Sequence, residues 1–344
     1  MQLNCIFSKG EFMRTYRGYL TVAAAALLAG GFFALEAHAA ANITIVGASK
    51  GAGAFRMAAG LAEAVNKTSK TVNITNRESK GFVANTRLVA SGRSAIGMTN
   101  GIFVDFIQRK HKPFHKGKAM MTIRGIGPVS TSWFQVATFH KSGIKSYYDL
   151  AGKRVNMGPR GSSTLFMLKF ITDNIKVTGK IRKDYMGWSQ AATNMIDGKL
   201  DAFAIPNPVP APAILRASRS GPLRILSIPD EVRDKFVAMS SGYYKANKDA
   251  SAYQGMKGKK FKTVAYTIFA VANKDVSNDV IYEVTRRTYD KANRDFLINV
   301  FKGWKIGLDF ASKSGEFIKQ MGNFNMKLHP GAARFWKSKG YDVN

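Results

Sequence analysis

Two glycine-rich segments of the sequence carry residues suited to binding an anion. VGASKGAGAFRMAAGLAEAVN (46–66) and VNMGPRGSSTLF (155–166) each place a glycine turn between a β-rich run and a helical pattern. A helix N-terminus presents free backbone N–H groups, and glycine lets a ligand approach the backbone closely. Each turn is therefore a candidate half-site for a carboxylate or a phosphate. For either turn alone, ordinary capping of a strand–helix connection is the alternative interpretation.

Neither nucleotide-binding template fits the first turn. The P-loop needs a second glycine five residues after the first, followed by Lys and then Ser or Thr. Ala52 stands five residues after Gly47, and no such pair follows Gly53. The dinucleotide pattern would use Gly51 and Gly53, but Arg56 replaces its third glycine. A nucleotide is therefore not expected, and we predict no cofactor.

The second turn offers more polar side chains. Ser162, Ser163 and Thr164 supply hydroxyls and a helix cap. Arg160 supplies a guanidinium fork that can pair with a carboxylate. We expect Ser162–Thr164 to form the main carboxylate cradle. Arg160 either pairs with the ligand directly or is a solvated loop arginine.

The residue types needed for catalysis and for metal binding are missing or scattered. There is no G-x-S-x-G nucleophile motif, and the one cysteine, Cys5, precedes an N-terminal apolar run. His111, His115 and His140 have no cysteine or paired carboxylate at metal-ligand spacing. We interpret His329, in LHPGA, as a structural residue at a turn. We predict no catalytic residue and no metal site, with an exported hydrolase or lyase on a similar fold as the less favoured alternative.

The first 39 residues have the composition of a secretory signal peptide. Arg14 and Arg17 precede an uncharged apolar run from Tyr19 to Phe33, and "EAHAA" then provides small residues at the spacing of a signal-peptidase site. We therefore assign residues 1–39 to a signal peptide and expect the mature protein in the periplasm. An uncleaved membrane anchor is the alternative, but the run is short for a membrane span.

The chain is strongly basic, with 52 Lys and Arg against 22 Asp and Glu and a formal net charge of +30. The basic residues are spread along the sequence, without zinc-finger spacing, an RNA-binding sheet motif or a basic tail. We therefore expect no nucleic-acid partner. Such a surface favours anionic ligands, an anionic membrane face or an acidic habitat.

Short β-rich runs alternate with helical patterns, which predicts an α/β fold. Strands are expected at about 42–48, 71–79, 94–100, 131–140, 183–189, 200–206, 223–229 and 263–275. Helices are expected at about 55–67, 81–92, 102–110, 162–174 and 190–198, and from 278 onward. Segment 147–158 should hold a short helix and a strand. The polar, Gly- and Lys-rich segment 241–262 should be an exposed loop.

Three ordered segments resemble the TAXI group of solute-binding proteins, which serve TRAP (tripartite ATP-independent periplasmic) transporters. They are SGIKSYYDLAGKRVNMGPRGSST (142–164), NMIDGKLDAFAIPNPVP (194–210) and LHPGAARFWKSKG (328–340). The first matches the family pattern SGI.S..DL.GKRV..G..GSGT, with Ser163 where the family usually has glycine. Each motif is modest alone, but the ordered set is specific, and the likeness runs over most of residues 42–341.

This resemblance implies an α/β fold, a two-lobed periplasmic binding protein (type II-like) with a hinge and an interlobe ligand cleft. By analogy, lobe one is 40–136 plus 267–344 and lobe two is 137–266, with hinge strands near Trp133–Thr138 and Val264–Val271. It also implies that the protein binds a small organic acid and delivers it to TRAP membrane permease subunits driven by an ion gradient, without ATP. We expect a monomer. A periplasmic adaptor that senses a ligand for a membrane receptor would share the fold and the pocket.

Two loops depart from the family pattern. Where the family has GGTYYPLG this chain has GAGAFRMA, so Phe55 keeps one aromatic position while Ala54 and Arg56 replace the other aromatic and the proline. The second loop, ESKGFVAN, keeps Asn85 and loses the usual Ser-Val-Glu. The ligand is therefore not carried over from the family. An amino acid, a keto acid and an aromatic acid each fit the expected electrostatics.

Open α/β sheets bind ligands beyond the carboxyl ends of their strands, which defines the candidate site. The expected ligand-binding residues of lobe one are Ser49, Lys50, Gly51, Gly53, Phe55, Ser79, Gly81, Asn85, Thr99 and Asn100. Those of lobe two are Arg160, Gly161, Ser162, Ser163, Thr164, Trp188, Ser189, Pro206 and Asn207.

Several of these residues also have a structural interpretation. Asn85 either hydrogen-bonds the ligand or faces water on a helix surface, and Phe55 either walls the pocket or joins the core. Trp188 either covers the ligand or packs in the core, and Ser189 after it is expected to cap a helix. Lys50 either compensates an anionic ligand or is surface charge.

Overall fold

The computed structural model describes residues 39–313 and 315–343. The chain divides into two units, Met1–Ala39 and Ala40–Asn344, and the fold is that of the second unit. The signal peptide expected over residues 1–39 lies outside the described residues except for Ala39. Within the described ranges, no helix combines the length and the apolar character needed to cross a membrane.

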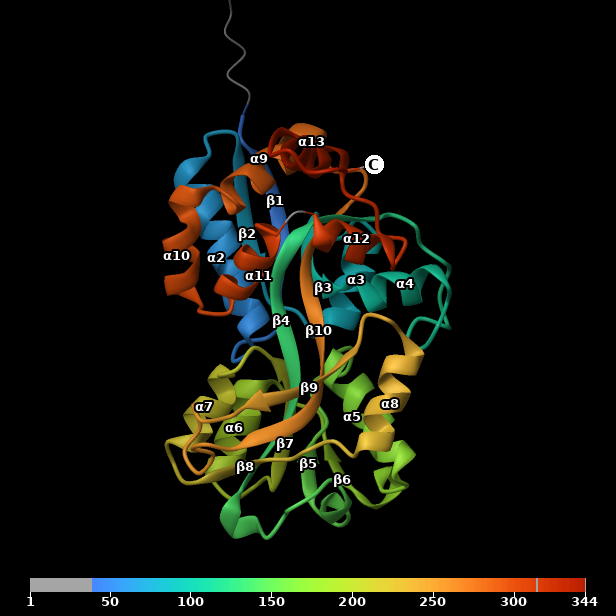
Figure 1. Ribbon diagram of the computed structural model, residues 1–344, viewed down its shortest axis with the longest axis vertical. Coiled ribbons are helices and arrows are strands. Elements are labelled where there is room, and N and C mark those ends of the chain that lie inside the picture. Colours follow the sequence, from blue (N-terminus) through green and yellow to red (C-terminus); the bar gives the residue numbers. More distant parts are fainter. Residues whose placement is uncertain (1–38, 314, 344) are drawn as a thin grey trace, which may run out of the picture. The chain divides into compact units, whose positions relative to one another are not determined.

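One ten-stranded sheet runs through the second unit in the order β2-β1-β3-β10-β4-β7-β5-β6, with β8 paired to β4 and β9 paired to β10 (Figure 1). The strands are β1 (Ala41–Val46), β2 (Val72–Arg77), β3 (Ile96–Asn100), β4 (Ile123–Phe139), β5 (Arg154–Asn156), β6 (Arg182–Asp184), β7 (Ala202–Asn207), β8 (Leu223–Ile225), β9 (Tyr244–Asp249) and β10 (Lys260–Asn273). The pairs β1–β2, β1–β3, β5–β6 and β5–β7 are parallel, which requires crossover connections, and helices supply them.

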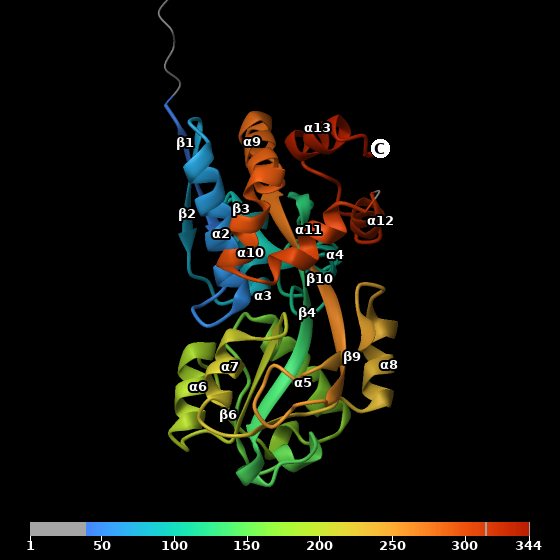
Figure 2. The same ribbon diagram turned by 60° about the vertical axis from the view of Figure 1, so that its left-hand side comes forward.

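Two long antiparallel strands, β4 and β10, connect the two halves of the sheet (Figures 1 and 2). Residues 268–272 of β10 pair with β3, whereas residues 260–265 pair with β9. On β4, residues 133–138 pair with β7. Both long strands therefore exchange one set of neighbouring strands for another at about the same point along the sheet, which divides the sheet into two halves. The α/β two-lobed, type II-like fold is confirmed.

Helices cover the sheet in both halves (Figure 2). They are α2 (Gly53–Thr68), α3 (Phe82–Ala90), α4 (Gly101–Gln108), α5 (Ser163–Asn174), α6 (Trp188–Ile196), α7 (Pro212–Ser218), α8 (Asp230–Met239), α9 (Asn278–Thr288), α10 (Arg294–Val300), α11 (Trp304–Ala311), α12 (Glu316–Gly322) and α13 (Pro330–Ser338). Short 3₁₀ turns lie at His140–Ser142, Tyr148–Leu150, Thr178–Lys180 and Lys291–Asn293. Every expected strand and helix has an observed counterpart.

Helix α2 shows why the first glycine turn leads into a helix. Met57, Leu61 and Val65, spaced four residues apart, form a stripe that is completely buried. Gly60 on the same helix leaves room for the indole of Trp304 on α11, because a Cβ there would lie 3.2 Å from its nitrogen. The buried stripe fixes the helix, and the helix in turn fixes the position of the glycine turn before it.

The C-terminal motif containing His329 is structural, as interpreted from the sequence. His329 is completely buried, and its Nδ1 accepts a hydrogen bond from the Gly331 N–H at the start of α13. Burial lowers the pKa of this histidine, so the neutral form that can accept the bond is favoured. Gly331 itself packs against α9, where a Cβ would lie 2.1 Å from the Asn278 carbonyl oxygen.

The prediction of an exposed loop over residues 241–262 is wrong for much of that segment. Residues 244–249 form β9, which pairs antiparallel with residues 260–265 of β10. The side chains of β9 are half-buried or exposed, so the strand lacks the apolar alternation that would reveal it. Lysines on an exposed edge strand discourage pairing with other chains, which explains the polar composition. Tyr243 and Ala250 at its two ends are buried and anchor it.

Candidate functional site

Each of the two glycine turns predicted from the sequence contacts the opposite side of the lobe junction. The Gly53 N–H, at the start of α2, donates a 2.8 Å hydrogen bond to Oδ1 of Asn207, at the end of β7. The Ala84 N–H, on α3, donates a 2.9 Å bond to the Gly161 carbonyl in the second turn. A Cβ added at Gly51 would lie 2.7 Å from the Ser189 backbone nitrogen. The strand ends of both lobes therefore touch directly.

A residual cavity of about 10 Å³ remains between these strand ends. It is lined by Ala48, Ala52, Ala54, Gly81, Phe82, Ser132, Ser163, Trp188, Pro206, Asn207 and Ile268. A space of this size is at the lower limit for a single water molecule. The two sides of the junction are therefore in close contact, and the space between them is too small for a solute. None of the lining side chains is charged.

The second turn contributes buried hydroxyls from the start of α5. Ser162 is the N-cap, as expected, because its side chain accepts a hydrogen bond from the Leu165 N–H. Thr164 is completely buried, and its hydroxyl has no hydrogen-bond partner among the described residues. Gly158, with φ of +82°, leaves room for it, since a Cβ there would lie 2.6 Å from the Thr164 Cβ. The second turn thus leads into a helix whose first turn holds a buried hydroxyl without a partner among the described residues, next to Ser163, which lines the cavity.

Tyr266, on β10, is a member of this site that the sequence analysis missed. Its hydroxyl donates to Ser163 Oγ at 3.4 Å and also faces Ser132 and Asn100. Burial raises the pKa of Tyr266 to about 12, so the phenol stays protonated at neutral pH. A tyrosine in the middle of the expected strand 263–275 was the only available signal, because tyrosine is also an ordinary core residue.

Asn85 does not face water, so that alternative is wrong. The residue is completely buried, and its Nδ2 donates to the carbonyls of Gly47 (2.6 Å) and Met98 (2.8 Å). Asn85 therefore ties the end of β1 to β3 and positions the first glycine turn. Its Oδ1 and the Ser49 hydroxyl are buried without a partner among the described residues.

Other polar residues at these strand ends hydrogen-bond to neighbouring helices or to their N-terminal turns. Asn100 caps α4 by accepting a 2.8 Å bond from the Phe103 N–H. Thr99 lies 2.8 Å from the hydroxyl of Thr86 on α3. Ser79 is half-buried and accepts a bond from the Gly81 N–H.

The expected cations lie outside the small cavity. Lys50 is exposed and 3.6 Å from Glu78, and the Arg160 guanidinium lies 4.2 Å from the centroid of the Tyr185 ring. Arg160 is exposed as well, and Phe55 is only half-buried and does not line the cavity.

The expectation that Ser189 caps a helix is wrong. Helix α6 begins one residue earlier, at Trp188, with Gly187 as its N-cap and no side-chain cap, and Ser189 is exposed on its first turn. Trp188 is buried, its indole N–H donates to the Ala204 carbonyl at 3.0 Å, and its ring lines the cavity. The tryptophan therefore combines the core and pocket-wall roles that the sequence left as alternatives.

A family model supplies the identification. The model of the NMT1-like family matches residues 45–340, which is most of the chain. The chain belongs to the NMT1-like family. The proteins of this family are periplasmic solute-binding proteins.

Several solved structures resemble this NMT1-like chain in fold. One, from work on glutathione import via GshT and the cystine ABC importer TcyBC of Streptococcus mutans, is 14% identical with a TM-score of 0.47 and covers 77% of this chain and 95% of that one. The aliphatic sulphonate binding protein SsuA of Escherichia coli is 16% identical, with a TM-score of 0.40 and coverage of 76% and 79%. The alkanesulfonate-binding protein SsuA of Xanthomonas axonopodis pv. citri is 15% identical, with a TM-score of 0.43 and coverage of 87% and 93%.

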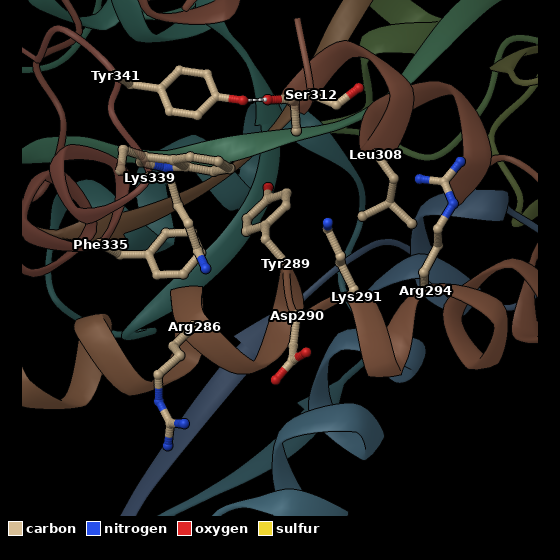
Figure 3. A pocket seen from close by; sticks show the side chains of 12 residues that line it. Arg286, Tyr289, Asp290, Lys291, Arg294, Leu308, Ser312, Phe335, Lys339 and Tyr341 are labelled. Atoms are coloured by element: carbon tan, nitrogen blue, oxygen red, sulfur yellow. Dashed lines mark hydrogen bonds between the residues drawn. The ribbon is translucent and has the colours of Figure 1, made fainter. Parts of the chain in front are cut away.

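A larger cavity of this chain lies away from the strand ends, among the C-terminal helices (Figure 3). Its volume is about 830 Å³. It is lined by Arg286, Tyr289, Asp290, Lys291, Arg294, Leu308, Ala311, Ser312, Phe335, Trp336, Lys339 and Tyr341. Two of its arginines are already neutralised, since Arg286 pairs with Glu283 and Arg294 with Asp309. No residue of this cavity was predicted as a site from the sequence.

The structure shows no metal centre where it describes the chain: no three His, Cys, Asp or Glu side chains there gather closely enough to hold an ion. His111 and His115 of the HKPFH segment are both exposed. The His111 ring lies 4.4 Å from the ring of Phe106 on α4.

Proposed function

We propose that the protein is a TAXI-type solute-binding protein that captures a small organic acid between its lobes and delivers it to a TRAP permease driven by an ion gradient. The lobes are 40–136 plus 267–344 and 137–266, as the family resemblance implies. The observation that carries the proposal is that each glycine turn contacts the opposite side of the lobe junction and that Ala52, near the first turn, and Ser163, after the second, line the small cavity there. Thr164, next to Ser163, carries a buried hydroxyl without a partner among the described residues. An unpaired buried hydroxyl is costly, and a ligand would satisfy it.

The solute would enter when the lobes separate and would replace contacts that the lobes now make with each other. Opening frees the Gly53 N–H and the Asn207 side chain, which bond to each other in the closed form. It also exposes the Ser163 and Thr164 hydroxyls at the N-terminus of α5, where the backbone favours a negative charge. A ligand that contacts both lobes stabilises the closed form by its differential affinity.

The neutral lining of the junction narrows the ligand class. Backbone N–H groups, serine and threonine hydroxyls and the Tyr266 phenol are the available donors, and the cations lie outside. Such donors suit a single carboxylate rather than a highly charged anion. Apolar walls from Phe82, Trp188 and Ile268 suit a small apolar body. An amino acid, a keto acid and an aromatic acid fit this description.

Cellular location and partners belong to the same proposal. Residues 1–39 would direct export to the periplasm and be removed there. The mature monomer would then meet the membrane-embedded permease subunits and release its ligand to them.

Native mass spectrometry of the mature protein, purified without refolding, is the first test. The mass under gentle conditions is compared with the mass under denaturing conditions. We expect an excess equal to one small organic acid, or, if the ligand is lost, a thermal shift with at least one acid of a panel. An empty protein that responds to no acid would contradict the proposal.

A substitution at Thr164 tests where that acid binds. Thr164→Val keeps the side-chain shape and removes the hydroxyl, so we expect at least tenfold weaker binding of the identified acid by calorimetry. Thr172→Val, farther along α5 with its hydroxyl bonded to the Leu168 carbonyl, is the matched control and should leave affinity unchanged. Equal affinity of both variants would remove the turn from the site.

The energy source for uptake distinguishes delivery to a TRAP permease from delivery to an ATP-driven transporter. Proteoliposomes that contain the permease subunits but no ATP are given an ion gradient and this protein. They should then accumulate the acid. Uptake should stop when an ionophore collapses the gradient. Uptake that requires ATP would contradict the TRAP assignment while leaving solute binding intact.

A further inference from the structure

A second cavity, of about 520 Å³, lies at the edge of the lobe junction and takes residues from both lobes. One wall is formed by Arg56 on α2 and by residues 299–306, from the end of α10 to the first turn of α11. The other wall is formed by residues 208–219 after β7, which include α7. The lining residues are Arg56, Pro208, Val209, Pro210, Pro212, Leu215, Arg216, Arg219, Asn299, Val300, Phe301, Lys302, Gly303 and Ile306. The volume lies within the range of small-molecule sites.

The charges of this cavity are of one sign. Arg56, Arg216, Arg219 and Lys302 line it, and no Asp or Glu does. None of the four cations forms an ion pair with any residue that the structure describes. This contrasts with the 830 Å³ cavity, where two arginines are paired with carboxylates. Uncompensated cations converging on a concave surface favour an anionic ligand.

Two of the cations are held in place by neighbouring residues. The Arg216 side chain donates to the Ser189 carbonyl and to the Thr193 hydroxyl, both on α6. The Arg56 guanidinium lies 5.9 Å from the centroid of the Phe301 ring. A guanidinium that is already positioned loses less conformational entropy when an anion binds.

The remaining lining is apolar. One side of the cavity consists of Pro208, Pro210, Pro212 and Leu215. The other side includes Phe301 and Ile306. Prolines and an aromatic ring form a stiff surface for a hydrocarbon or aromatic body. We propose that this cavity is a second binding site, distinct from the cleft, for an amphipathic organic anion: a carboxylate with an apolar body.

The site is physically linked to the contact between the lobes. Phe301 packs against Gly53, where a Cβ would lie 2.7 Å from the ring and 2.8 Å from Asn207 Oδ1. Pro208 follows Asn207 directly and lines the cavity. A ligand that touches both walls binds the closed form more tightly than an open one. Occupancy therefore favours closure, and closure by the cleft ligand raises the affinity of this second site in return.

Octanoate is the probe for this site, with octanamide as its uncharged counterpart. Calorimetry on the mature protein should show octanoate binding and at least tenfold weaker octanamide binding. Arg219→Ala with Lys302→Ala should weaken octanoate at least tenfold. Both side chains are exposed, so the fold should persist, which circular dichroism and melting check. The matched control is Lys291→Ala with Lys339→Ala in the 830 Å³ cavity, which removes the same charge and should change octanoate affinity less than twofold.

Three outcomes would overturn the second site: no octanoate binding, equal binding of octanamide, or an equal loss of affinity in the control pair. Thr164→Val separates this inference from the proposed function. Octanoate binding that persists in Thr164→Val supports the second site, whatever the cleft binds. Octanoate binding lost in Thr164→Val and kept in the Arg219/Lys302 variant would place octanoate in the cleft and refute the second site alone.

Discussion

The backbone N–H of Gly53 and the side-chain oxygen of Asn207, 154 residues apart in the chain, are joined by a 2.8 Å hydrogen bond. Gly53 begins α2, and Asn207 ends β7. The Asn207 residue is anchored on its own side, since Gln135 donates to its carbonyl at 3.0 Å. This bond is thus a direct link across the junction, at the place where we propose that a solute binds.

Removing the Asn207 side chain should therefore favour the open form. In Asn207→Ala the Gly53 N–H loses its partner in the closed form, at a cost of about 1 kcal/mol, which shifts the closed-to-open ratio about fivefold. Small-angle X-ray scattering of the ligand-free protein should show a larger radius of gyration. Asn207→Asp, which keeps an acceptor for the N–H, should scatter like the wild type. An unchanged radius in Asn207→Ala would show that this bond does not hold the lobes together.

Gly53 should not tolerate a side chain. A Cβ at this position would lie 2.7 Å from the Phe301 ring and 2.8 Å from Asn207 Oδ1. Gly53→Ala should destabilise the closed protein by about 1–3 kcal/mol, as overpacked sites do, and lower its melting temperature. Gly179→Ala is the control, because nothing lies within 4 Å of a Cβ there. A Gly53→Ala melting curve that coincides with that of Gly179→Ala would contradict the described packing.

The architecture and both glycine turns were predictable because they depend on local patterns. The alternation of β-rich and helical runs, the glycines before α2 and α5 and the Ser162 cap all lie within short stretches of sequence. Strand β9 was missed because it is an exposed edge strand without apolar alternation. Ser189 was misassigned as a cap because a serine beside a helix start resembles one, although the N-cap lies two residues earlier, at Gly187.

Which residues make up the site could be predicted only in part, because it depends on tertiary contacts that no local sequence pattern reveals. Asn85 bonds to carbonyls 38 and 13 residues away, so its burial follows from the packing of β1 against β3. Tyr266 reaches Ser163 across 103 residues. The 520 Å³ cavity joins segments more than 150 residues apart, from Arg56 to Pro208 and Phe301. Such sites require the tertiary structure, because the residues that form them are ordinary surface or core types when considered alone.

Substitutions at the two polar positions at the start of α5 should differ in their effect on the stability of the free protein. Ser162→Ala removes the N-cap bond to the Leu165 N–H and should cost about 1 kcal/mol. Thr164→Val removes a buried hydroxyl without a partner, so its free energy of unfolding should stay equal or rise. Urea unfolding of the ligand-free variants measures both. A Thr164→Val variant as unstable as Ser162→Ala would mean that the hydroxyl is satisfied in the free protein.

Acid should weaken lobe two through Asp201. Its carboxylate accepts bonds from the Arg154 side chain, at 2.8 Å to Nη2, and from the Arg154 backbone N–H, at 2.7 Å. These bonds lower the pKa of Asp201 below its ordinary value, and the bond from the Arg154 guanidinium has the largest effect. They tie the start of β5 to that of β7, and β5 leads directly into the second glycine turn.

The pKa of Asp201 is lower in the folded protein than in the unfolded chain, where it is near 4. The contribution of Asp201 to stability is therefore fully present above the unfolded-state pKa and is lost as the pH falls through the folded-state pKa. Melting temperatures of the wild type and Asp201→Asn, measured from neutral pH downward, should differ by a constant amount above about pH 5 and converge below about pH 4. Asp295→Asn, at an exposed position, should melt like the wild type throughout. A gap between wild type and Asp201→Asn that widens on acidification would contradict the assigned direction of the shift.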